Sequence, residues 1–123
     1  MDDAPFFDTL LRFPRRPEWR PLAGVARLSQ STDAYPSIDE DDFMYMARVE
    51  SRGGKLRIHL YKHIETRHSL NLDDAGHAYR YRDHIDEGDA RYDEGASGGC
   101  YSLHRTLGDA LHHVVDDLEW MRA

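Results

Sequence analysis

The segment DFMYMARVESRGGKLRIHLYKH, residues 42–63, decides the fold. Apolar residues alternate with polar or long residues on both sides of Gly53 and Gly54, which is the pattern of two strands that each bury one face. Adjacent glycines suit a two-residue hairpin turn, because that turn needs positive φ at both central positions. Pairing across the turn places Val49 opposite Ile58, so the apolar residues of both strands share one face. The segment therefore predicts a β-hairpin.

A second hairpin is predicted in SLNLDDAGHAYRYR, residues 69–82, with residues 73–76 as its turn. This turn places Leu72 on the same face as Tyr79. Between the two hairpins the chain must reverse within residues 62–67, although no Gly, Pro, Asn or Asp lies there. The face opposite Leu72 carries Arg67, Ser69, Asn71, Arg80 and Arg82.

The remaining segments are assigned from apolar spacing and proline content. Residues 2–13 combine helical apolar spacing with acids at the start, which predicts a short N-terminal helix. Residues 106–121 predict a C-terminal helix whose first turn is capped by Thr106. We expect an extended connector at 14–21, a polar loop at 29–42 and an acidic loop at 83–100. Residues 100–105 form either a fifth strand or the first turn of the C-terminal helix, and the strand is favoured.

These elements predict an α+β fold in a single domain, residues 1–123. An antiparallel meander of four to five strands packs on the C-terminal helix, and the short N-terminal helix lies alongside. The predicted core contains Phe6, Leu10, Phe43, Tyr45, Val49, Ile58, Leu60, Leu70, Tyr79, Leu107, Leu111, Val114 and Leu118.

Composition and charge narrow the classes of function. No stretch approaches the roughly 18 apolar residues that a membrane span requires, and the N-terminus is not a secretory signal. Cys100 is the only cysteine, so a reducing, cytoplasmic location is the simplest interpretation. The net charge is -7, yet residues 43–82 carry +4 while residues 30–42 and 83–99 carry -5 each. An acidic protein can therefore still present a basic surface.

The histidines raise the question of a metal site. His59 and His63 lie four residues apart on a predicted strand, which is roughly 13 Å at about 3.3 Å per residue and too far for one ion. On the C-terminal helix Asp109, His113 and Asp117 line one side, but such pairs are more often solvated than metal-binding. The sequence also contains no recognisable catalytic motif. We therefore predict no metal, no cofactor and no catalytic residue, and a binding protein rather than an enzyme.

The first functional hypothesis is a protein-interaction module, such as an inhibitor, immunity or anti-defence protein, that occupies a basic site on a partner protein. Acids near a helix C-terminus oppose the helix dipole, so helix stability does not explain them. Trp120 lies nearly opposite the apolar stripe and is predicted to anchor a partner or a homodimer, with packing under the proline-rich segment as the alternative. The predicted partner-binding residues are Asp109, His113, Asp116, Asp117, Glu119 and Trp120.

The second hypothesis is a nucleic-acid or anionic-ligand binder that uses the polar face of the sheet. Arginines bind phosphates, and aromatic rings stack on bases. The overall acidity of the chain makes this the less favoured alternative. The residues of this predicted anion-binding face are Arg48, Arg57, His59, Tyr61, Arg67, Arg80 and Arg82.

Overall fold

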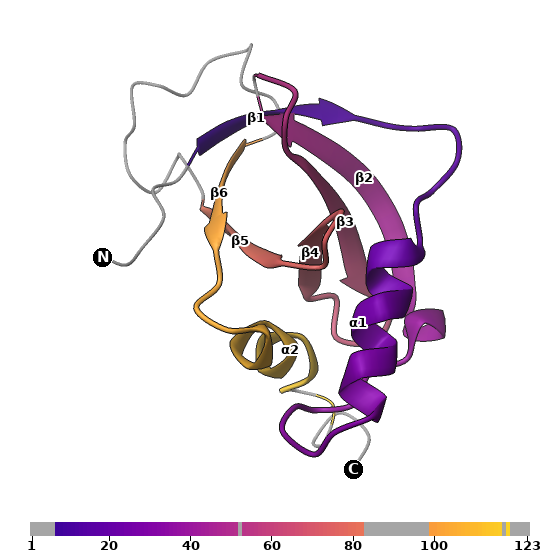
Figure 1. Ribbon diagram of the computed structural model, residues 1–123. Helices are drawn as coiled ribbons and strands as arrows, with labels where there is room; N and C mark the ends of the chain where they lie inside the picture. Colours follow the sequence, from indigo (N-terminus) through magenta and orange to yellow (C-terminus); the bar gives the residue numbers. More distant parts are fainter. Residues whose placement is uncertain (1–6, 52, 83–98, 117, 119–123) are drawn as a thin grey trace.

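The computed structural model describes residues 7–51, 53–82, 99–116 and 118. Six antiparallel strands pair in sequence order, and the first pairs with the last to close a barrel (Figure 1). The elements are β1 (Phe7–Arg12), α1 (Arg20–Gln30), the 3-10 helix η1 (Glu40–Asp42), β2 (Phe43–Ser51), β3 (Arg57–His63), β4 (Ser69–Asp73), β5 (Ala78–Arg82), β6 (Gly99–Leu103) and α2 (Leu107–Val115). The predicted α+β class and antiparallel sheet are confirmed, but the described part of the chain forms six strands rather than four to five.

The first predicted hairpin is confirmed as β2 and β3. Val49 pairs with Ile58, as the alternating pattern predicts. The register shifts between Tyr45 and Ala47, so that Tyr45 pairs with Tyr61. Such a bulge inserts one extra residue in β2 and increases the local bend of the strand. It also moves Tyr45 to the opposite face from the one predicted.

The two faces of the curled sheet bury two separate clusters. Val49, Ile58, Tyr79 and Tyr101, from four different strands, pack against one another and fill the barrel. The outer face is covered by α1 and α2, which lie outside the ring of strands (Figure 1). This second cluster contains Leu22, Val25, Ala26, Ile38, Phe43, Tyr61, Leu70, Leu72, Ala78, Ala110, Leu111 and Val114.

Burial of the outer face overturns one prediction. His59 and Tyr61 were expected on the polar face of the sheet, but the exposed fractions of His59, Tyr61 and the neighbouring His63 are 2%, 0% and 1%. The reason is the unpredicted helix α1, which packs on this face together with α2. Alternate residues of each strand point into the barrel and out of it. The outward-facing residues can form a second hydrophobic core when helices cover them.

The N-terminal segment is a strand and not the predicted helix. β1 pairs with both β2 and β6, with Leu11 opposite Val49 and Phe7 opposite Tyr101. Its hydrogen bonds satisfy the outer edges of both neighbouring strands, which would otherwise be exposed. Residues 2–6 of the predicted helix lie outside the described residues.

Helix α1 begins within the expected connector, residues 14–21, and ends within the expected polar loop, residues 29–42. Pro21 lies in its first turn, where a missing N–H is tolerated, and the Glu18 carboxylate accepts a hydrogen bond from the Arg20 N–H at 3.1 Å. Its buried residues include Leu22, Val25, Ala26 and Ser29, at the spacing of one helical face.

The C-terminal helix α2 spans Leu107–Val115, whereas the prediction was 106–121, of which residues 117 and 119–121 lie outside the described residues. As predicted, the Thr106 hydroxyl accepts a hydrogen bond from the Asp109 N–H, at 3.0 Å. Of the predicted core, Phe6 lies outside the described residues, and Leu10, Tyr45, Leu60, Leu107 and Leu118 are only partly buried. The other predicted core residues, Phe43, Val49, Ile58, Leu70, Tyr79, Leu111 and Val114, are buried.

The second hairpin forms, but with a shorter turn than predicted. The Asp73 N–H donates to the His77 carbonyl at 3.0 Å, which leaves three residues in the loop instead of four. Gly76, with φ of 91°, supplies the left-handed residue that such loops need. A change of one residue reverses the faces. Tyr79 therefore pairs with Asn71, and the prediction that Tyr79 shares a face with Leu72 is wrong.

Candidate anion-binding cleft

A cleft opens where β4 and β5 separate. These strands share only two pairs, Asn71 with Tyr79 and Leu72 with Ala78, whereas β3 and β4 share five. Beyond Asn71 no further pair of described residues joins the two strands, and helix α2 contacts both of them. The resulting cavity has a volume of about 380 Å³. It is lined by Arg67, His68, Ser69, Asn71, Tyr79, Arg80, Tyr81, His104 and His113.

The turn between β3 and β4 places two of these residues. His63 Nδ1 accepts hydrogen bonds from the N–H groups of Glu65 and Thr66, at 3.1 and 3.3 Å. The Thr66 hydroxyl donates to the Val114 carbonyl of α2 at 2.8 Å, which fastens the turn to that helix. As a result the His68 ring lies 4.9 Å from the His113 ring, measured between centroids.

Arg67 has an unusual backbone conformation within this turn. Its φ is 67°, in the left-handed region that Gly and Asn favour. The turn needs that conformation, because the Arg67 N–H donates back to the His63 carbonyl at 2.9 Å. A left-handed conformation costs about 1 kcal/mol or more at a residue with a side chain. An arginine here is therefore not explained by the turn itself.

The described residues that line the cavity include several cationic or protonatable side chains. Its lining contains two arginines and three histidines, and no carboxylate is among the described residues that line it. The whole chain has a net charge of -7, so the cationic and protonatable groups of the cavity lining differ from the chain as a whole. Guanidinium and imidazolium groups donate strong hydrogen bonds to phosphate and sulfate oxygens.

The surroundings of His104 lower its pKa. Burial lowers the pKa of His104 first of all, and the nearby positive charges of His113 and Arg80 lower it further, against a smaller opposing effect of Asp109. A like-charge cluster disfavours protonation until an anion enters and neutralises it. Around His104 the effects of His113 and Arg80 on its pKa therefore outweigh the opposing effect of Asp109.

The predicted anion-binding face is not formed as one surface. Arg48 pairs with Glu50 at 2.8 Å, and Arg57 pairs with Asp74 at 2.8 Å. His59 and Tyr61 are buried beneath the helices. Of the predicted residues, Arg67 and Arg80 are brought together in the cleft, and the Arg82 side chain lies outside the described part of the structure.

His59 belongs to a second polar cluster. The Tyr45 hydroxyl lies 3.0 Å from His59 Nδ1, and Asp74 Oδ1 lies 2.7 Å from His59 Nε2. Although burial raises the pKa of Asp74, hydrogen bonds from His59 and Arg57 outweigh it and leave that pKa lowered. With both ring nitrogens engaged and the ring almost fully buried, His59 ties together β2, β3 and the β4–β5 turn.

The acidic-face hypothesis stays a prediction. Asp109, His113 and Asp116 are exposed on or beside α2, and His113 also lines the cleft. Asp117, Glu119 and Trp120 lie outside the described residues.

Several cleft residues were missed as site residues, namely His68, Ser69, Asn71, Tyr79, Tyr81 and His104. They come from four different segments, and their convergence depends on strand pairing and on the docking of α2. The one local signal is Arg67, which lies in a turn that lacks the usual turn residues.

Comparisons with protein families, curated proteins and solved structures find no match to this chain. Within the described part of the chain, no helix is long and apolar enough to cross a membrane. Among those same residues, no group of three His, Cys, Asp or Glu side chains is placed to hold a metal ion.

Proposed function

We propose that the protein binds a small phosphate-bearing ligand in the β4–β5 cleft. The observation that supports this is the lining of a single cavity of about 380 Å³ by Arg67, Arg80 and three histidines. The volume lies within the range of small-molecule sites, at about 300–1,000 Å³. The left-handed backbone of Arg67 adds support, since strained residues cluster at binding sites.

Arg67→Gly separates binding from folding. Glycine relieves the left-handed backbone, so stability should stay equal or rise by up to about 1 kcal/mol. Loss of the guanidinium should weaken sulfate binding about tenfold or more, because hydrogen bonds to charged groups contribute about 1.5–3 kcal/mol. Calorimetric titration with sulfate and thermal melting of the same variant measure both effects.

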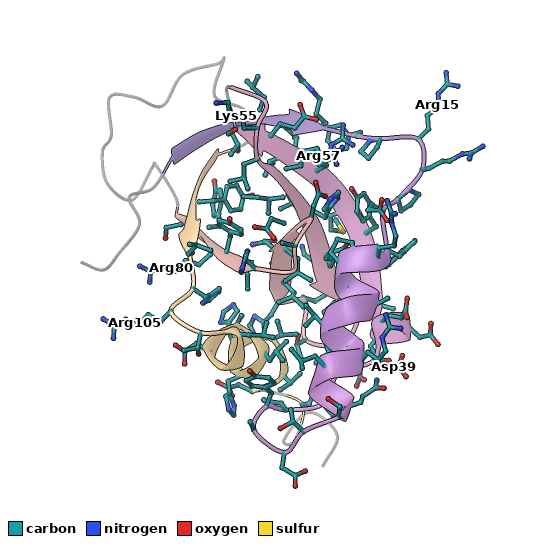
Figure 2. The ribbon with its side chains drawn as sticks, in the orientation of Figure 1. Arg15, Asp39, Lys55, Arg57, Arg80 and Arg105 are labelled. Carbon is teal, nitrogen blue, oxygen red and sulfur yellow. The ribbon has the colours of Figure 1, made fainter. Side chains whose placement is uncertain are left out.

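The matched control is Arg15→Ala, which removes the same charge. Arg15 projects from the side of the molecule away from Arg80 (Figure 2). Its loss should change sulfate affinity by less than about twofold, because exposed charges farther apart than about 8–10 Å are screened at physiological salt. If both variants weaken binding equally, sulfate responds to net charge alone, and the cleft is not the site.

Sulfate binding should strengthen as the pH falls below 6.5. The pKa of His104 is lowered from its ordinary value of 6.5, so the unfolded chain binds more protons than the folded protein in this range. Stability is therefore lost as the pH falls from 6.5 through the folded-state pKa. A bound anion favours the protonated ring and restores that loss. Melting curves between about pH 5 and 8, with and without sulfate, should show a stabilisation by sulfate that grows as the pH falls, and this growth should shrink in the His104→Gln variant.

A further inference from the structure

Tyr81 gives the cleft an aromatic wall. It is 53% exposed and lines the same cavity as Arg67 and Arg80, although its ring lies on the Tyr101 face of β5 and the Arg80 side chain leaves the strand on the opposite face. Its ring is held edge-on by the buried Tyr101 ring, with centroids 5.3 Å apart and planes at 63°. A supported and exposed ring next to a phosphate-binding cluster is a suitable surface for stacking a flat group.

The polar site also extends past the first cavity. Arg80 and His104 line a second cavity, of about 310 Å³, together with Leu103, Arg105 and Asp109. Figure 2 shows Arg80 and Arg105 on the same flank of the molecule. The two cavities therefore share Arg80 and His104 in their linings.

We infer that the ligand is a nucleoside phosphate, whose base stacks on Tyr81 while its phosphate lies between Arg67 and Arg80. This inference rests on the proposed anion-binding function. A flat base and a phosphate match the aromatic wall and the cationic lining of the same cavity. A long nucleic-acid strand fits less well, because a chain with a net charge of -7 repels each additional phosphate outside the cleft.

The test compares four nucleoside monophosphates with ribose phosphate, which lacks only the base, by calorimetric titration. At least one nucleotide should bind about tenfold tighter than ribose phosphate. Tyr81→Leu should remove that advantage, a loss of between about 5-fold and 100-fold in nucleotide affinity, because one stacked base contributes about 1–3 kcal/mol. Ribose phosphate affinity should change less than twofold in this variant, and Tyr81→Phe should retain nucleotide binding.

The outcomes distinguish the inference from the function on which it rests. If sulfate binds but every nucleotide binds no tighter than ribose phosphate, the inference fails and the anion site stands. If sulfate and all the phosphates fail to bind, the proposed function itself fails. If a single-stranded hexanucleotide binds more than about a hundredfold tighter than its best mononucleotide, the ligand is a nucleic-acid strand and the inference is wrong.

Discussion

Replacing Asp73 with alanine should lower the free energy of unfolding by about 3 kcal/mol or more. The buried carboxylate organises the turn between β4 and β5. Its Oδ1 accepts hydrogen bonds from the N–H groups of Ala75 and His77, both at 2.9 Å. Its Oδ2 accepts from the Tyr79 hydroxyl at 3.0 Å and lies 3.2 Å from His77 Nδ1. Each donor left without an acceptor in a buried site costs about 1–3 kcal/mol.

Two variants make this prediction specific. Asp73→Asn keeps an oxygen for the two backbone donors, so its loss should be less than half that of Asp73→Ala. Asp33→Ala removes the same carboxylate from an exposed loop position and should change stability by at most about 0.5 kcal/mol. Urea unfolding measures all three. A loss below about 1 kcal/mol for Asp73→Ala would show that water replaces the carboxylate and that the turn holds without it.

The Asp73 turn also shows why the sequence predicted one hairpin better than the other. In the first hairpin the alternating pattern of both strands predicts the register of Val49 with Ile58, although the expected turn is not formed, since of the two glycines Gly54 has positive φ and Gly53 does not. In the second hairpin the Asp73 side chain makes the turn, and a three-residue loop replaces the expected four. Loop length depends here on side-chain hydrogen bonds, which residue spacing does not reveal.

The strand β1 shows a second reason why the sequence does not predict the whole fold. Residues 7–12 have apolar spacing that fits a helix over a short length, and short apolar runs are ambiguous between helix and strand. Pairing with both β2 and β6 decides the matter, and these partners lie far away in the sequence. The bulge near Met46 likewise bends β2 and reverses the face of Tyr45, which the alternating pattern alone does not reveal.

The candidate site could be predicted only in part. Arg67 and Arg80 were expected to bind anions, because the middle of the chain is basic. His104 and His113 reach the same cavity through the docking of α2 on the sheet, which is a tertiary contact. The sequence therefore predicts which segment carries the positive charge. The position of the cavity depends on where β4 and β5 separate, which is a tertiary feature.

Replacing Leu111 with alanine should lower the free energy of unfolding by about 2–5 kcal/mol. Leu111 is fully buried where α2 meets the outer face of the sheet, in the cluster that contains Leu22, Tyr61 and Leu70. The change removes buried methyl groups and leaves a cavity that the closed barrel and two helices cannot easily collapse. Urea unfolding should show a lower midpoint with an unchanged slope.

The control is Leu28→Ala, the same deletion on the exposed side of α1, where the leucine is 47% exposed. It should cost less than about 1 kcal/mol, because less apolar surface leaves water there on folding. Equal losses for Leu111 and Leu28 would contradict the docking of α2 on the sheet. The comparison also bears on the cleft, since α2 carries His113 and accepts the Thr66 hydrogen bond at Val114. If α2 were loosely docked, His113 would not stay beside His68, and sulfate binding would lose its dependence on these histidines.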